Sequence, residues 1–302
     1  MPDPARFRHS VVLSLLLLRA YPQARRPWLY RLARLGVAGV YLYLVLALGL
    51  LAAEDLLAFN PAPATAYWTP PPPGLDPGDI ELTSADGTEL HAWWSEPMGW
   101  TPQQGALLLC HGQGGNLSSM GRAALQWRDL LGVAVLLFDY PGFGYSAGSP
   151  SETGIYAAAD AAYDWMVSEK RVPATRVLIM GQSLGGGVAV DLASRRPHRA
   201  LLLFSTFTSF PEAAQSTLHV FPARWLAHNQ FRNDEKIGKI ATPVFVVHGT
   251  ADRTIPYWQG ERLFAAVTSE HKRFVRVDGG THNLIDRPEV LKAACEFLAG
   301  ND

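Results

Sequence analysis

The chain has 302 residues, of which 48% are apolar and 18% are charged, enough for one domain of roughly 200–250 residues and an additional segment. Its net charge of −1 conceals an uneven distribution: residues 1–53 carry seven arginines and one acid, whereas the remainder carries 19 basic and 26 acidic residues. The mildly acidic main body argues against nucleic-acid binding, and the basic terminus beside an apolar segment indicates contact with anionic lipid.

The first predicted element is a transmembrane helix over residues 35–53, nineteen positions without a charge, which is about the length that crosses a bilayer. Arginines precede it and acids follow it. The positive-inside rule therefore predicts a basic cytoplasmic or interfacial segment over 1–34 and a single-pass protein whose main domain is extracytoplasmic. A shorter apolar run, residues 10–18, is predicted to lie in the membrane interface, with a buried helix as its alternative.

A cleaved signal peptide is the alternative for the same region. Its charged part would be far too long, and its apolar stretch exceeds the usual length of about 7–15 residues. The transmembrane helix is therefore the interpretation that we prefer.

Proline dominates the linker that follows, residues 54–78, which contains four consecutive prolines in "TPPPPG". Its prolines lie in the stretch 59–79, which therefore cannot form a helix or a central strand and favours extended polyproline. The sequence predicts a stiff spacer that holds the domain away from the membrane.

Residues 79–302 read as an α/β domain. An opening hairpin, "DIELTS" and "TELHAWW", turns at Asp86-Gly87. Short apolar runs then alternate with helical patterns, which predicts a mostly parallel sheet with helices on both faces. The runs occupy 106–110, 133–138, 177–180, 200–204, 244–248 and 273–277, and the helices include 156–170, 184–196, 257–269 and 288–300. Ligands bind beyond the carboxyl ends of such strands, so chemistry is expected there.

A serine follows one of these strands in the sequence Gly181-Gln182-Ser183-Leu184-Gly185, a G-x-S-x-G pattern. A serine on a sharp strand-to-helix turn has a strained backbone, and only glycine on both sides leaves room for the strand and the helix to pass. The turn presents the hydroxyl at the positive end of a helix dipole. We predict that Ser183 is a nucleophile.

The base and the acid are expected after two later strands. Asp252 and His282 occupy those loops, which completes the chain order Ser–Asp–His. The alternatives are that Asp252 only caps a helix and that His282 only bonds the backbone. Asp139 is a rival acid that precedes the serine. His248 and His111 also end strands, each before a glycine, and are expected to have core or turn-stabilising roles.

Two backbone N–H groups are candidates for the oxyanion hole: that of Leu184, after the nucleophile, and that of Gln113, in the loop "HGQGGN". No Lys-Ser/Thr pair makes this loop a phosphate cradle. The dinucleotide-like "GFGYSA" at 142–147 is rejected because more turn residues follow it instead of a helix. The chain's two cysteines, Cys110 and Cys295, are expected in the core, with a disulfide between them as the alternative.

Five motifs in order, "HGQGGN", "FDYPGFGYSAGSPSE", "GQSLGG", "HGTADRTIP" and "GGTHN", resemble the α/β-hydrolase superfamily. Within it, the chain is most similar to the membrane-anchored, depalmitoylase-like branch of α/β-hydrolase-domain proteins and their bacterial relatives. The resemblance implies the triad Ser183–His282–Asp252 and an oxyanion hole from Leu184 and Gln113. Where relatives often have asparagine, this chain has Gln113, which keeps the backbone donor but puts any side-chain role in doubt.

The resemblance also implies that the insertion at 206–239 is a short cap. Phe207, Phe210, Phe221 and Trp225 are its candidate apolar walls, and a core or surface role is equally open to them.

The function predicted is that of a serine hydrolase that cleaves a carboxylic ester or a thioester, without metal or organic cofactor. The substrate is a small molecule, and a lipid-like or acylated one fits a site kept near a bilayer. A serine peptidase on the same triad and a non-catalytic, membrane-tethered binding protein are the alternatives. The sequence leaves the oligomeric state open.

Overall fold

The computed structural model describes residues 12, 13, 16 and 27–300. The chain divides into two compact units, one that ends at Ala53 and one that begins at Glu54. Most of the basic segment 1–34, and most of the apolar run 10–18 predicted for the membrane interface, lie outside the described residues.

The first unit contains helix α2 (Pro27–Ala52), which begins eight residues before the predicted span. The earlier start has a local cause: Pro27 suits the first helical position, where its missing N–H costs nothing. At a rise of 1.5 Å per residue, its 26 residues extend about 39 Å. The helix is long and apolar enough to cross a membrane, and it exposes leucines and valines along its length.

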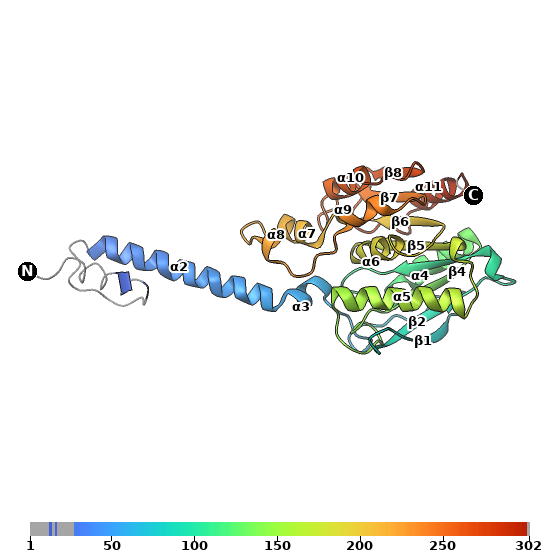
Figure 1. The fold of residues 1–302 in the computed structure, drawn as a ribbon, viewed down its shortest axis with the longest axis horizontal. Coiled ribbons are helices and arrows are strands. Elements are labelled where there is room, and N and C mark those ends of the chain that lie inside the picture. The colour runs from blue at the N-terminus through green and yellow to red at the C-terminus, as the bar shows by residue number, and fades with distance from the viewer. Residues whose placement is uncertain (1–11, 14–15, 17–26, 301–302) are drawn as a thin grey trace, which may run out of the picture. The chain divides into compact units, whose positions relative to one another are not determined.

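The second unit is built on one eight-stranded sheet in the order β1-β2-β4-β3-β5-β6-β7-β8 (Figure 1). Strands β1 and β2 form an antiparallel hairpin, β2 pairs antiparallel with β4, and all remaining neighbours are parallel. The strands are β1 (Gly78–Thr83), β2 (Glu89–Ser95), β3 (Ala106–Cys110), β4 (Ala134–Phe138), β5 (Val177–Gln182), β6 (Ala200–Phe204), β7 (Val244–Gly249) and β8 (Lys272–Val277). The predicted fold class and the mostly parallel sheet are confirmed.

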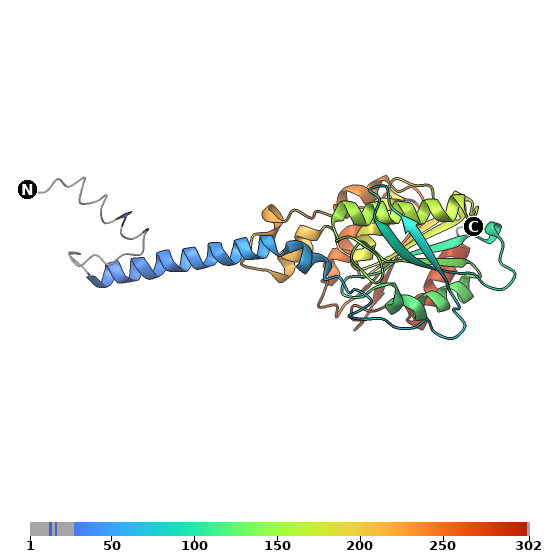
Figure 2. The same cartoon turned by 90° about the horizontal axis from the view of Figure 1, so that it is seen from below.

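Helices cover both faces of this sheet, as Figure 2 shows. Helices α5 (Glu152–Ser168), α6 (Leu184–Ala193) and α10 (Tyr257–Ala265) pack on one face, and α4 (Gly121–Leu131) and α11 (Pro288–Ala299) pack on the other. Because side chains alternate along a strand, each strand feeds both cores. In β3, Leu108 belongs to the first core, whereas Leu107 and Leu109 belong to the second. Full burial on both faces explains the continuous apolar runs of the sequence.

The insertion between β6 and β7 carries three short helices, α7 (Phe210–Thr217), α8 (Ala223–Leu226) and α9 (Asn233–Lys236). Of the four aromatics predicted as apolar walls, Phe207 and Phe221 are buried and Phe210 packs against the first core. Trp225 is 85% exposed. The core and surface alternatives therefore describe these side chains.

The sequence predicts a stiff spacer for the proline-rich segment, and in the structure this segment packs along the second unit. It begins with a short helix, α3 (Glu54–Phe59), whose Phe59 is fully buried beside Phe231. Farther on, Asn116 Nδ2 donates to the carbonyl oxygens of Ala62 and Tyr67. Proline removes backbone donors but leaves carbonyl acceptors free, so a side-chain amide can fasten such a segment.

Candidate active site

Ser183 lies at the turn between β5 and α6, with φ 53° and ψ −119°. Such angles are sparsely populated by residues other than glycine and cost on the order of 1–3 kcal/mol. Strand β6 and the loop after it hold the turn: the N–H of Ser183 donates to the carbonyl of Phe204 at 2.9 Å, and Thr206 Oγ1 donates to the carbonyl of Ser183 at 2.8 Å. The surrounding sheet therefore maintains a conformation that the chain alone would not adopt.

The flanking glycines are required by the closeness of the turn to its surroundings. A Cβ on Gly181 would overlap the carbonyl group of Gly185. A Cβ on Gly185 would overlap the carbonyl of Cys110 and lie 2.5 Å from the carbonyl oxygen of His111. The strand, the turn and the helix can approach one another this closely only without these side chains.

Asp252 and His282 come together from the loops after β7 and β8. His282 Nδ1 lies 2.8 Å from Asp252 Oδ2, and the other carboxylate oxygen accepts the backbone N–H groups of Thr254 and Ile255 at 2.8 and 2.9 Å. The Asp252 side chain is fully buried, while that of His282 is 21% exposed. The carboxylate is fixed from behind, and the imidazole edge faces the surface.

The charge of Asp252 is set by competing effects. Burial raises the pKa of its carboxyl group, but hydrogen bonds from His248, His282 and the N–H of Ile255 together lower it well below the ordinary value. The group is therefore an anion at neutral pH. An anion beside Nδ1 favours the His282 tautomer that carries its proton there, which leaves Nε2 as a proton acceptor.

His248 is a site residue that sequence reasoning assigned only to a core or turn role. It is completely buried, and its Nε2 lies 2.9 Å from the carbonyl oxygen of Ile255 and 3.4 Å from Asp252 Oδ2. It therefore contacts the same carboxylate oxygen of Asp252 as His282 does. Its position at the end of β7, four residues before Asp252, is the only signal in the sequence, and that signal is weak.

The loop after β3 passes directly beside Ser183, since a Cβ on Gly112 would lie 3.5 Å from the Cβ of Ser183. Within the part of the chain that the structure describes, neither the N–H of Gln113 nor that of Leu184 donates to a protein acceptor. The side chain of Gln113 turns away, and its Nε2 donates to the carbonyl oxygen of Leu57 at 2.6 Å. The loop thus keeps a free backbone donor while its side chain is bound to α3.

Ser183 and His282 line one pocket of about 460 Å³. The loop after β3 forms its second wall, and Tyr67 of the proline-rich segment borders it. The remaining lining residues are Ser119, Met120, Arg122, Ala123, Gln182, Asn283, Ile285 and Asp286. The four cap aromatics are not among the described residues that line it, nor does any group of three or more His, Cys, Asp or Glu in the described chain offer a metal site.

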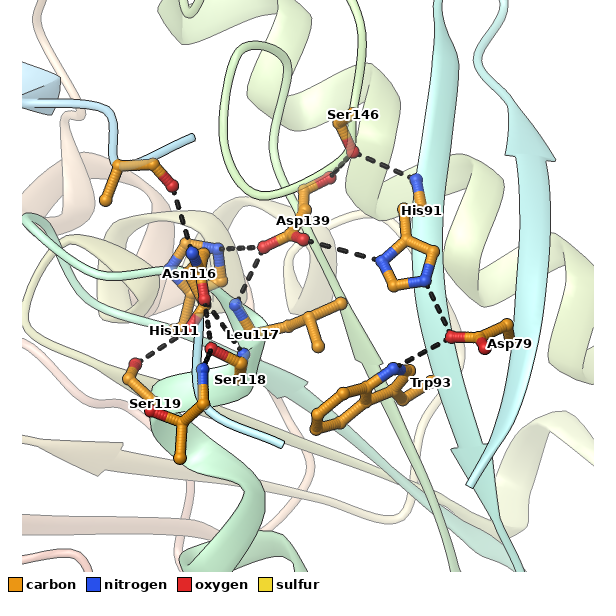
Figure 3. A network of polar contacts seen from close by, with 12 residues as sticks. Asp79, His91, Trp93, His111, Asn116, Leu117, Ser118, Ser119, Asp139 and Ser146 are labelled. Carbon is orange, nitrogen blue, oxygen red and sulfur yellow. Dashed lines mark hydrogen bonds and ion pairs between the residues drawn. The ribbon is translucent and has the colours of Figure 1, made fainter. Parts of the chain in front are cut away.

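Asp139, the rival acid, lies in a different network (Figure 3). Its Oδ1 accepts the N–H of Leu117 at 2.7 Å and lies 3.7 Å from His111 Nε2, and its Oδ2 lies 3.7 Å from His91 Nδ1. On its other side, His91 Nε2 lies 2.8 Å from Asp79. The carboxylate is fully buried and holds the chain just after the loop that passes Ser183, so it is placed to support that loop.

The pKa values of the two histidines around Asp139 are shifted in opposite directions. Burial lowers the pKa of His91, but the carboxylates of Asp139 and Asp79 on either side raise it overall. Burial lowers the pKa of His111 and prevails over the same carboxylate. His91 is therefore the histidine that takes up a proton first, next to strand β1 and away from the pocket of Ser183.

Cys110 and Cys295 are both free, which excludes the alternative of a disulfide between them. Cys110 is buried in β3, and Cys295 lies partly buried in α11. The turn at 142–147 leads to no helix until Glu152, in agreement with the rejection of a dinucleotide fingerprint.

Comparisons with known proteins agree with this architecture. Residues 105–227 match the family model described as alpha/beta hydrolase fold. An uncharacterised protein of Mycobacterium tuberculosis is 38% identical over 223 residues, which cover 73% of this chain and 78% of that protein. Alpha/beta hydrolase domain-containing protein 17B of Xenopus laevis is 32% identical over 199 residues, 64% of this chain and 66% of the relative.

Among solved structures, the esterase Pf2001 of Pyrococcus furiosus superposes with a TM-score of 0.67. The alignment covers 80% of this chain and 96% of the esterase at 18% identity, which is a likeness of fold.

Proposed function

The chain belongs to the α/β-hydrolase family, and from that premise we propose that it is a serine hydrolase of carboxylic esters or thioesters. The single observation that carries the proposal is the hydrogen-bonded pair Asp252–His282, which shares one pocket with a serine held at φ 53°. A backbone this strained persists only where surrounding structure maintains it, and such positions cluster at active sites.

In the proposed reaction, His282 Nε2 takes the proton of the Ser183 hydroxyl as its oxygen attacks the acyl carbon. Asp252 holds Nδ1–H and stabilises the imidazolium that forms. His282 then gives the proton to the leaving alcohol or thiol, and water releases the acyl group by the same steps. Apart from the substrate and the hydrolytic water, the proposed reaction uses only Ser183, His282 and Asp252 for attack and proton transfer.

The negative charge that develops on the substrate oxygen is proposed to bind the N–H groups of Gln113 and Leu184. Both are unengaged by protein acceptors in the described chain, and the Gln113 loop lies against Ser183. One such donor is typically worth about 3–4 kcal/mol at the barrier. The side chain of Gln113 takes no part, because it is bound to α3.

The proposed substrate is a small ester, thioester or acylated molecule. The solved structure of an esterase in Pyrococcus furiosus has the same fold, and the pocket beside Ser183 opens to solvent along a loop rich in glycine. An acylated or lipid-like substrate fits best with α2 as a single transmembrane helix. The basic residues before α2 support a cytoplasmic N-terminus and an extracytoplasmic catalytic domain.

The test is labelling with a fluorophosphonate together with hydrolysis of p-nitrophenyl esters of increasing acyl length. Wild type is expected to be labelled and to turn over, and Ser183→Ala is expected to do neither. Ser205→Ala, at a fully buried serine that also has a positive φ, serves as the control and should remain labelled. Equal labelling of wild type and Ser183→Ala would reject the proposal.

A further inference from the structure

Two segments that lie far apart in the sequence expose large apolar side chains. On α3, Leu56 and Leu57 are 63% and 53% exposed. On α8 of the cap, Trp225 is 85% exposed and Leu226 is 43% exposed. Side chains of this kind on adjoining elements form an apolar surface that water solvates poorly.

The two segments are fastened to each other by a buried carboxylate. Glu54, 7% exposed, accepts the backbone N–H groups of His228 and Asn229 at 3.1 and 2.8 Å. Asp55 accepts Asn229 Nδ2 at 2.8 Å and lies 2.9 Å from His228 Nε2. Figures 1 and 2 both show α3 beside the cap, as these contacts require.

The fastening brings the exposed side chains together. Leu56 and Leu57 directly follow the two acids, and Leu226 precedes His228 by two residues. Successive Cα atoms are 3.8 Å apart, so each exposed side chain begins within about 12 Å of the fastening. Leu56, Leu57, Trp225 and Leu226 are called the α3–cap surface below.

Chain connectivity decides what this surface meets. Helix α2 ends at Ala52 and α3 begins at Glu54, so the fastening lies within about 8 Å of the end of α2 along the chain. A helix that crosses a bilayer places its end at the lipid headgroups, where tryptophan is enriched. The α3–cap surface therefore cannot be far from lipid once α2 is inserted.

We propose that the α3–cap surface binds the bilayer that α2 crosses, with Trp225 and the three leucines immersed at the level of the headgroups and the first acyl carbons. This inference rests on the proposed membrane insertion of α2. The partner of the α3–cap surface is the lipid of the same membrane, because α2 keeps these four side chains close to that lipid at all times. Immersion of apolar side chains beside a transmembrane anchor needs no further partner.

One hydrogen bond connects the α3–cap surface to the candidate active site. Leu57 belongs to the α3–cap surface, and its carbonyl oxygen accepts a hydrogen bond from the side chain of Gln113, a residue that lines the pocket of Ser183. In the proposed arrangement the membrane therefore contacts α3, the helix to which the side chain of Gln113 is bound. An acyl chain leaving the bilayer would meet the protein one helix away from that loop.

The test uses the full chain in phosphatidylcholine nanodiscs, with the partly buried Cys295 replaced by serine and one new cysteine carrying the fluorophore NBD. The labelled positions are Leu57→Cys, Trp225→Cys and, as the control, Met98→Cys. Met98 is fully exposed and follows β2, which runs antiparallel to β4, so it lies at the edge of the sheet opposite Ser183.

Labels at 57 and 225 are expected to lose fluorescence when doxyl-labelled phosphatidylcholine is included, and the label at 98 is not. Absence of quenching at 57 or at 225 would overturn the proposal. A shielded label that doxyl lipid does not quench would mean that protein, such as a second copy, covers the surface, and would also overturn it. Fluorophosphonate labelling of Ser183 in the same discs reports separately on the proposed catalytic function.

A matched pair of variants tests the consequence for substrate. Leu226→Ser is compared with Leu130→Ser, a leucine of similar exposure on α4. The ratio of hydrolysis of a long-chain acyl ester in the disc to that of soluble p-nitrophenyl acetate should fall roughly three- to tenfold for Leu226→Ser. Leu130→Ser should keep the wild-type ratio, and equal ratios for both variants would contradict the role of the surface.

Discussion

Replacing Asp252 by asparagine should inactivate the protein without unfolding it. Asp252 Oδ1 accepts two backbone N–H groups, from Thr254 and Ile255, so the asparagine oxygen must occupy that place. Its amide nitrogen then faces His282 Nδ1, where Oδ2 stood at 2.8 Å. An amide donates at this position, so the imidazole must carry its proton on Nε2 instead, and it can no longer accept the proton of Ser183.

The size of the effect follows from this change of tautomer. An equivalent exchange of aspartate for asparagine in a serine protease triad lowers kcat about 10⁴-fold, and a loss of similar order is expected here. Stability should fall by only about 1.5–3 kcal/mol, since the charge that His248 and His282 contact is lost while the amide still bonds to His282 and both backbone bonds to Oδ1 persist. The assay is hydrolysis of p-nitrophenyl butyrate, with thermal unfolding followed by circular dichroism.

Asp139→Asn is the matched control, because Asp139 is also a buried carboxylate after a strand but contacts His91 and His111. It should lower the melting temperature and leave the enzyme active. The reasoning would be refuted if Asp252→Asn kept kcat near the wild-type value, or if Asp139→Asn caused the larger loss of kcat.

Three further predictions concern packing, pH and thiols. Gly185→Ala should prevent stable folding, because its Cβ would overlap the carbonyl of Cys110, whereas Gly78→Ala, whose nearest neighbour would be 3.9 Å away, should keep solubility and melting temperature. At His228, burial acts to lower the pKa, but contacts with Glu54 and Asp55 raise it above 6.5. The contribution of these contacts to folding stability is therefore present below pH 6.5 and is lost as the pH rises through the folded-state pKa of His228. The difference in melting temperature between wild type and His228→Gln should accordingly shrink between about pH 6 and about pH 8.5, and a difference that grows would contradict the contact. In the native protein iodoacetamide should modify Cys295 and spare Cys110, because burial strongly raises the pKa of the Cys110 thiol. Mass spectrometry of the alkylated peptides measures this order, and faster modification of Cys110 would contradict the prediction.

Much of the candidate active site could be predicted from the sequence, because the carboxyl ends of parallel strands lie at the same edge of a sheet. Ser183, Asp252 and His282 each follow an apolar run, so the edge that they share could be predicted before their contacts were known. Position after a strand does not by itself separate Asp252 from Asp139, and the sequence favoured Asp252 only through the chain order Ser–Asp–His. Strand order separates them: β7, which precedes Asp252, lies next to β8, which precedes His282, whereas β4, which precedes Asp139, lies on the other side of β3.

Other features depended on contacts that leave no local pattern. The proline-rich segment was predicted to be a stiff spacer, and the sequence did not indicate that Asn116 and a buried Phe59 attach it to the domain. His248 supports Asp252 from below, and Glu54 joins α3 to a loop more than 170 residues away. The composition of a segment indicates which secondary structure it can form by itself. It does not indicate which distant side chain will bind its carbonyl groups.

By itself the sequence determined the alternation of strands and helices, the turn at Ser183 and the presence of a long apolar helix. These are local properties, because hydrophobic periodicity and the lack of a Cβ act over a few residues. Only the tertiary structure decided that His248 also contacts Asp252, where Gln113 directs its side chain, and that α3 is bound to the cap. Those outcomes depend on the order in which strands pair and on contacts between residues far apart in the chain, which local pattern does not encode.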